Sequence, residues 1–249
     1  MLFKSITALL LLCLISSCDK SVENVTMSNT NESITTTSND PSDSILVDAS
    51  RDGGVWWFPQ AGNFYATKEH QGKALADYLR SLGFSVNELP RGASITWEEL
   101  KKYKKVIRAG AFGNYKLEEI AAYDSLLHHS SSLLLLSDHL QNFSNDGLSA
   151  HLGLEFSGSY TGIIVPSSNH VINTGVSSLS YIAGSVIIQP DPAKMTILGY
   201  VKANATSKAY AAMGILQHPS SKIFFIGDSN GIELLPQPFT SNLVKWLFQ

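Results

Sequence analysis

The order of apolar segments predicts an α/β fold with a mostly parallel sheet, helices on both of its faces and an antiparallel extension in the second half. Two observations carry this prediction. In residues 44–152, short apolar runs alternate with stretches whose apolar residues recur at helical spacing, as in parallel sheets with crossover helices. In residues 163–215, the apolar runs follow one another without helical spacers, as antiparallel strands do.

The first half contains four strand-and-helix units. Strands are predicted at four apolar or alternating runs, residues 44–48, 84–88, 105–109 and 132–137. Helices are predicted where apolar side chains recur every three or four positions, at residues 67–82, 96–103, 117–127 and 146–152. Gly83 suits the end of the first helix, and Thr96 with Glu99 forms a capping box at the start of the second. The alternation predicts a parallel sheet that is covered on both sides, and the fully apolar run at residues 132–137 predicts a strand buried on both faces.

The second half consists mainly of predicted strands. Four runs joined by turns form the antiparallel part, residues 163–165, 185–188, 196–200 and 210–215. Residues 223–228 are predicted to form a further strand of the parallel part of the sheet. A closing helix is predicted at residues 239–248, directly after Pro238, because proline suits the first turn of a helix.

The first eighteen residues carry a targeting signal. Lys4 precedes an apolar run that is too short to cross a bilayer but right for a signal peptide. The run ends in Ile-Ser-Ser-Cys18, which resembles the bacterial lipobox. Residues 1–17 are therefore predicted to be a lipoprotein signal peptide, with Cys18 lipidated and inserted in the bilayer. The expected location is the bacterial cell envelope, facing the periplasm or the cell surface. An ordinary secretory signal with a chance cysteine is the alternative.

A tether separates this anchor from the folded domain. Residues 19–43 contain 14 Ser, Thr or Asn residues and no aromatic residue, a composition that cannot bury enough apolar surface to fold. Residues 18–43 are predicted to be the lipidated cysteine and a disordered tether, and residues 44–249 the folded domain. Both cysteines, Cys13 and Cys18, precede that domain, which excludes disulfides and cysteine-bound metals within it. The net charge of −3 argues against nucleic-acid binding.

Polar residues follow several of the predicted parallel strands, where ligands of open α/β sheets bind. The candidate ligand-binding residues are Asp48, Asp138, His139, Asn142, Asp228 and Ser229. Carboxylates with an imidazole suit a divalent cation or the hydroxyls of a small carbohydrate-like ligand. The alternative is that each aspartate caps its own loop by accepting backbone N–H bonds. No metal ligand set is predicted beyond this.

An aromatic stretch follows the first strand. Trp56, Trp57 and Phe58 stand together in a predicted loop. They are expected to stack on sugar rings, to contact a protein partner of the envelope, or to fold over the core as a lid; burial is the commoner fate of such side chains.

Several of these segments, in this order, resemble the class I glutamine amidotransferase-like superfamily. They include Ile45–Asp48, Leu75–Phe84, Ser132–His139 and Ile223–Ser229. The resemblance is to its non-amidotransferase branch, which includes domains related to the trehalose-utilisation protein and to gliding-type auxiliary transport proteins. It implies a flavodoxin-like, glutamine amidotransferase-like fold over residues 44–249.

The chain departs from that family at the nucleophile. The family's catalytic cysteine corresponds to the region around Ser137, and no cysteine occurs there. Ser137 also lacks the flanking glycines of a nucleophile elbow. The expected function is therefore binding of a small ligand or protein partner. The alternative is a hydrolase acting on a glycan or small molecule, with Asp138 and His139 as acid–base groups. A third hypothesis is an auxiliary component of an envelope transport or gliding machine.

Overall fold

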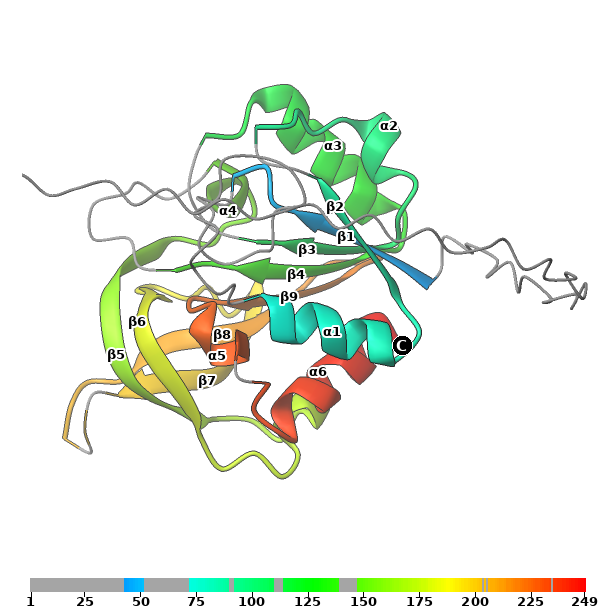
Figure 1. Ribbon diagram of the computed structural model, residues 1–249. Helices are drawn as coiled ribbons and strands as arrows, with labels where there is room; N and C mark the ends of the chain where they lie inside the picture. Colours follow the sequence, from blue (N-terminus) through cyan, green and yellow to red (C-terminus); the bar gives the residue numbers. More distant parts are fainter. Residues whose placement is uncertain are drawn as a thin grey trace, which may run out of the picture. The chain divides into compact units, whose positions relative to one another are not determined.

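The computed structural model describes residues 43–51, 72–89, 92–109, 114–138, 147–202, 204, 206–233 and 235–249. These residues form a nine-stranded sheet with flanking helices (Figure 1). The strands are β1 Ser44–Asp48, β2 Ser85–Leu89, β3 Lys105–Arg108, β4 Ser132–Leu136, β5 Phe156–Pro166, β6 Leu179–Ile187, β7 Met195–Lys202, β8 Tyr210–Leu216 and β9 Lys222–Ile226. The helices are α1 Lys73–Ser81, α2 Trp97–Leu100, α3 Leu117–His128, α4 Gly147–His151, α5 Asn230–Glu233 and α6 Phe239–Phe248.

Five strands form a parallel layer in the order β2-β1-β3-β4-β9. Figure 1 shows α1 and α6 on one face of this layer and α2, α3 and α4 on the other. Side chains of one strand alternate between the two faces, so Ile45 and Val47 belong to one core cluster and Leu46 to the other. Burial on both faces explains why β1 and β4 are apolar runs, whereas the edge strand β2 is only partly buried and carries polar residues.

The other four strands close into an antiparallel barrel. Strand β5 pairs with β6 and β7, and β8 also pairs with β6 and β7, so the four strands form a ring. Strand β8 also pairs with β9 and thereby joins the barrel to the parallel layer. These are the longest strands of the described chain, 7 to 11 residues each, whereas the parallel strands have 4 or 5.

The fold class predicted from the sequence is wrong for the second half of the chain. Of the nine strand pairings in the described residues, five are antiparallel, and the second half is a closed barrel rather than the extension of a flavodoxin-like open sheet. Closure depends on irregularities that hydropathy does not reveal: β5 shifts register around Tyr160 and β7 around Gly199. Such bulges bend and coil strands, which lets a short sheet close on itself.

Local signals predict several element ends correctly. Gly83 follows α1 with φ of +93°, a conformation that glycine adopts freely. The Thr96 hydroxyl accepts a hydrogen bond from the Glu99 backbone N–H at 3.2 Å, which caps α2. Among the described helices, none combines the length and the apolar character that a membrane span requires.

Candidate functional site

The predicted site residues that the structure describes divide into two groups. Asp48 ends β1, and Asp138 and Asp228 each follow the end of a parallel strand by two residues. All three are buried. Asp48 bonds to tyrosines of the core cluster beneath α3, whereas Asp138 and Asp228 lie near Tyr181, which belongs to the other cluster. His139, Asn142 and the aromatic residues Trp56 and Trp57 lie outside the described residues.

The group around Asp48 lies where the strand order reverses. The chain passes from β1 to β2 on one side and returns to β3 on the other, the position at which open α/β sheets bind ligands. Asp48 Oδ2 accepts hydrogen bonds from the Tyr123 hydroxyl at 2.6 Å and the Tyr115 hydroxyl at 3.2 Å. Its Oδ1 accepts from the Ser50 N–H at 3.0 Å. Both carboxylate oxygens therefore have donors within the protein.

An arginine stands beside this carboxylate. Arg108 is opposite Asp48 in the β1–β3 register and is fully buried. Its guanidinium donates to the Ser149 hydroxyl of α4 at 3.1 Å. Burial and the neighbouring Asp48 charge raise the pKa of Tyr123 well above its ordinary value, so its hydroxyl remains a donor at neutral pH. Asp48 and Arg108 are thus buried charges of opposite sign on neighbouring strands, and each is hydrogen-bonded within the protein.

An ion pair between Arg51 and Glu119 connects the segment after β1 to α3. Arg51 donates to Glu119 at 2.5 Å and to the carbonyl oxygens of Asn114 and Ala93. Glu119 also accepts from the backbone N–H groups of Lys116 at 2.9 Å and Ile95 at 3.1 Å. This carboxylate therefore joins three segments that are distant in sequence.

Glu119 gives the domain an expected acid sensitivity. Burial would raise the pKa of Glu119, but the hydrogen bonds from Lys116 and Ile95 and the Arg51 charge together hold it below its ordinary value. A lowered pKa contributes stability above the unfolded-state pKa of about 4.5, and this contribution is lost as the pH falls through the folded-state pKa. Glu119→Gln should lower the free energy of unfolding by about 1–3 kcal/mol at pH 7 and flatten its decline below pH ~4.5.

Urea unfolding at pH values from about 3 to 7 measures this effect. Glu118→Gln is the matched control, because Glu118 is the preceding residue on the exposed face of α3. Equal pH profiles for Glu119→Gln and the unmodified protein would contradict the assignment.

The second group joins β6 of the barrel to the ends of β4 and β9. The Asp228 carboxylate accepts from the Ile182 N–H at 2.7 Å. The Ser185 N–H donates to the Gly227 carbonyl at 2.7 Å, and the Ser137 and Ser185 hydroxyls are 2.9 Å apart. This edge of the sheet is therefore occupied by β6.

Tyr181 and Asp138 complete this junction. The Tyr181 hydroxyl donates to the Ser185 carbonyl oxygen, and the Ser229 hydroxyl donates to Asp138 Oδ2 at 2.9 Å. Burial raises the pKa of Tyr181 well above its ordinary value, and the charges of Asp228 and Asp138 add to that shift. The predicted convergence thus holds for Asp138, Ser229 and Asp228, which share the Tyr181 neighbourhood, but Asp48 stands apart.

The described residues can be compared with two kinds of chemistry considered from the sequence, metal binding and nucleophilic attack by Ser137. Within them, no three His, Cys, Asp or Glu side chains are grouped to hold a metal ion. Ser137 is fully buried and bonded to Ser185, which places it poorly for nucleophilic attack. A divalent cation at His139 and the strand-end aspartates stays a prediction.

Sequence reasoning does not identify Arg108, Tyr115 or Tyr123 as partners of Asp48. One signal was present: the short strand Lys105–Arg108 ends on an arginine after two apolar residues, and a charged residue inside a buried strand needs a partner. Tyr115 and Tyr123 carry no comparable signal, because aromatic residues on a helix face usually serve the core.

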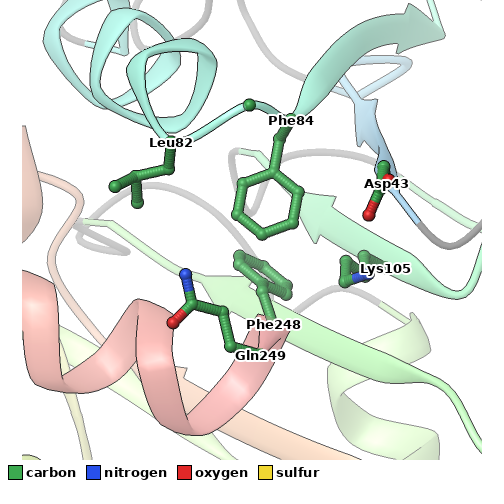
Figure 2. Close-up of a pocket in the computed structure, with 7 residues that line it drawn as sticks. Asp43, Leu82, Phe84, Lys105, Phe248 and Gln249 are labelled. Atoms are coloured by element: carbon green, nitrogen blue, oxygen red, sulfur yellow. The ribbon is translucent and has the colours of Figure 1, made fainter.

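A cavity of about 440 Å³ lies at the opposite edge of the parallel layer, beside the amino ends of β1 and β3 (Figure 2). Phe84 and Phe248 line it and pack edge to face, with ring centroids 6.4 Å apart, and the Lys105 ammonium lies 5.3 Å from the centroid of the Phe84 ring. Asp43, Leu82 and Gln249 line its mouth. None of the predicted site residues lines this cavity.

Comparison with known proteins places the fold. No family model matches the sequence, and no curated protein matches it. Among solved structures, the N-terminal domain of mmIFT52 is similar with a TM-score of 0.61 at 15% identity, over 83% of this chain and 96% of that one. A putative ThuA-like protein from Bacteroides uniformis is similar with a TM-score of 0.54 at 12% identity, over 84% and 91%. A β-galactosidase from Bacillus circulans sp. alkalophilus gives 0.52 at 13% identity, over 82% of this chain and 31% of that one.

These likenesses show the fold alone, and they correct the family assignment. The chain resembles IFT52-like and ThuA-like folds rich in β-structure rather than a flavodoxin-like glutamine amidotransferase. The assignment from sequence depended on the order of segments in the first half. That order is common to many α/β proteins, whereas the closed barrel of the second half distinguishes this fold.

Proposed function

We propose that the chain is a lipid-anchored protein of the bacterial cell envelope whose folded domain binds a small ligand or a protein partner. The observation that favours binding over catalysis is that the strand-end carboxylates are already hydrogen-bonded within the protein. Asp48 accepts three hydrogen bonds from Ser50, Tyr115 and Tyr123, Asp228 accepts from a backbone N–H, and Asp138 accepts from Ser229. Buried carboxylates bonded in this way stabilise the fold and are poorly placed for proton transfer.

The sequence supports both parts of the proposal. No cysteine follows Cys18, so the domain has no thiol nucleophile. Cys18 ends an apolar signal-like segment and precedes a polar tether, the arrangement that positions a folded domain at a membrane surface.

A hydrolase that uses Asp138 and His139 is the second candidate. One observation favours it: Asp138 is 8% exposed, whereas Asp48 and Asp228 are fully buried, so Asp138 is the strand-end carboxylate nearest to solvent. The partial likeness to a β-galactosidase makes glycosides the natural substrates to test.

The two cysteines provide a matched test of the anchor. In bacteria that express the full chain and are fed a labelled fatty acid, the unmodified protein should carry the label and sediment with membranes. Cys18→Ala should lose the label and most of the membrane-bound fraction, because acylation requires the thiol. Cys13→Ala should behave like the unmodified protein. Equal labelling of all three proteins would contradict the lipoprotein proposal.

A glycosidase assay on the same proteins distinguishes the binding proposal from the hydrolase proposal. The binding proposal predicts no release of the leaving group from chromogenic glycosides above the rate in buffer. Turnover by the unmodified protein that disappears in Asp138→Asn would replace it with the hydrolase.

A further inference from the structure

A second cavity lies on the barrel, and Asp48, Asp138 and Asp228 are not among its lining residues. It has a volume of about 310 Å³, which reaches the lower end of the range for small-molecule sites. Its walls come from β5, β7, β8 and the segment between β7 and β8. The lining residues are Tyr160, Thr161, Val201, Ser207, Lys208 and Tyr210.

The backbone of β5 is shaped to present Tyr160 to this cavity. The β5–β6 register shifts on both sides of Tyr160, and bulges of this kind redirect side chains next to binding sites. Gly158, two residues earlier, has φ of +74°. A Cβ at Gly158 would lie 2.6 Å from Tyr160 Cε2, so the ring occupies space that only a glycine leaves open.

Two tyrosine rings and one cation characterise the cavity. The Tyr160 and Tyr210 ring centroids are 4.8 Å apart with an interplanar angle of 43°. The Lys208 ammonium lies 5.2 Å from the Tyr210 ring centroid. Among the described lining residues, Lys208 is the one charged side chain, so this lining carries a positive charge. An acidic ligand would therefore be attracted to it.

Hydroxyl groups surround the aromatic surface. The Thr161 Oγ1 accepts from the Ala183 N–H at 3.0 Å, which fixes the oxygen and leaves its proton to donate. Burial and the adjacent Tyr210 raise the pKa of Tyr160, so its hydroxyl is neutral at physiological pH. Ser207 supplies a further hydroxyl.

We propose that this barrel cavity binds a saccharide that carries an acidic group, such as a hexuronic acid. The apolar face of the sugar ring packs on Tyr210 and Tyr160, the carboxylate pairs with Lys208, and the ring hydroxyls bond to Thr161 and Ser207. The inference rests on the proposed binding function and names its ligand class and place.

Titration calorimetry on the full chain, purified in detergent, tests the proposal with glucuronic acid and its neutral counterpart glucose. Glucuronic acid should bind with a Kd on the order of 1 mM, as a small ligand with few contacts does, and glucose at least ~10-fold more weakly. Lys208→Ala should weaken glucuronic acid binding about 10-fold and remove the preference over glucose, because the charge pairing is lost. Lys245→Ala, an exposed lysine on α6, is the matched control.

Tyr210→Ala should abolish binding of both sugars, and circular dichroism shows whether the variant is folded. Lys208 is exposed, so Lys208→Ala tests the proposal even if Tyr210→Ala does not fold. Failure of the unmodified protein to bind either sugar would overturn the inference, as would binding unaffected by Lys208→Ala. Loss of binding in Asp138→Asn but not in Lys208→Ala would place the sugar at the sheet edge. The fatty-acid labelling test is independent of all these outcomes.

Discussion

Replacing Gly227 by alanine is expected to produce a large loss of stability, because no other described glycine leaves less room for a Cβ. A Cβ at this position would lie 1.9 Å from the Ser185 carbonyl oxygen and 2.4 Å from the Tyr181 hydroxyl oxygen. Backbone oxygen cannot yield as a flexible side chain would, so β6 must separate from the end of β9. We expect the free energy of unfolding to fall by at least about 3 kcal/mol, the upper end of overpacking costs.

The effect should spread beyond the contact itself. The Gly227 carbonyl accepts from the Ser185 N–H, and its own N–H donates to the Ala212 carbonyl of β8 at 2.9 Å. Separation of β6 from the end of β9 therefore weakens the junction between the barrel and the parallel layer, which the β8–β9 pairing also holds together. A midpoint of thermal unfolding roughly 10 °C lower is expected for a chain of this size.

Gly147→Ala is the matched control for this prediction. Its Cβ would make ordinary contacts, 3.6 Å from the Ile120 Cδ1 and from the Tyr115 carbonyl oxygen, and it lies at the start of α4. Thermal unfolding followed by circular dichroism compares the two variants. Similar midpoints for Gly227→Ala and Gly147→Ala would show that the barrel junction is not as tight as the distances indicate.

Asp48→Asn is expected to produce the second large effect. The aspartate accepts from two tyrosine hydroxyls and one backbone N–H, all donors. Asparagine replaces one acceptor oxygen with an NH₂ donor, so either this NH₂ faces the Ser50 N–H or the two tyrosine hydroxyls must turn to accept from it, and in both arrangements a charge-assisted hydrogen bond is lost. It also removes the negative charge beside the buried Arg108. A loss of about 2–4 kcal/mol follows from these two causes.

A double-mutant cycle measures the coupling between Asp48 and Tyr123. Tyr123→Phe alone removes the 2.6 Å hydrogen bond and should cost about 1.5–3 kcal/mol, because its acceptor is a buried carboxylate. The double variant should cost less than the sum of the two single variants by at least about 1 kcal/mol, since the shared hydrogen bond is lost only once. Urea unfolding at pH 7 measures all four proteins.

Asp43→Asn is the control for Asp48→Asn, because Asp43 is an exposed carboxylate next to the other end of β1. It should change the free energy of unfolding by less than about 0.5 kcal/mol. Strict additivity of Asp48→Asn and Tyr123→Phe would contradict the network around Asp48.

Local sequence predicts the elements of the first half because the physical cause of each is local. Buried parallel strands must be apolar over their whole length, and β4 shows this in Ser132–Leu136. Thr96 and Gly83 mark helix ends through hydrogen bonds and backbone conformation within a few residues. The same reasoning predicts that strand-end polar residues come near one another, which Asp138, Ser229 and Asp228 do.

Asp48 shows where that reasoning fails. Three strand-end aspartates lie at one edge, but the pleat and the loop after each strand decide which face of the sheet each side chain meets. Asp48 meets the α3 side and bonds to Tyr115 and Tyr123, whereas Asp228 meets Tyr181 and β6.

By itself, the sequence determined the strand-and-helix units of the first half, the lack of a thiol in the domain and the candidate strand-end residues. It also predicts the anchor at Cys18. Only the tertiary structure decided that the second half closes into a barrel, that β6 covers the ends of β4 and β9, and that Arg108 stands beside Asp48. The physical reason is that strand pairing and side-chain burial depend on residues far apart in the chain, and no local pattern specifies them.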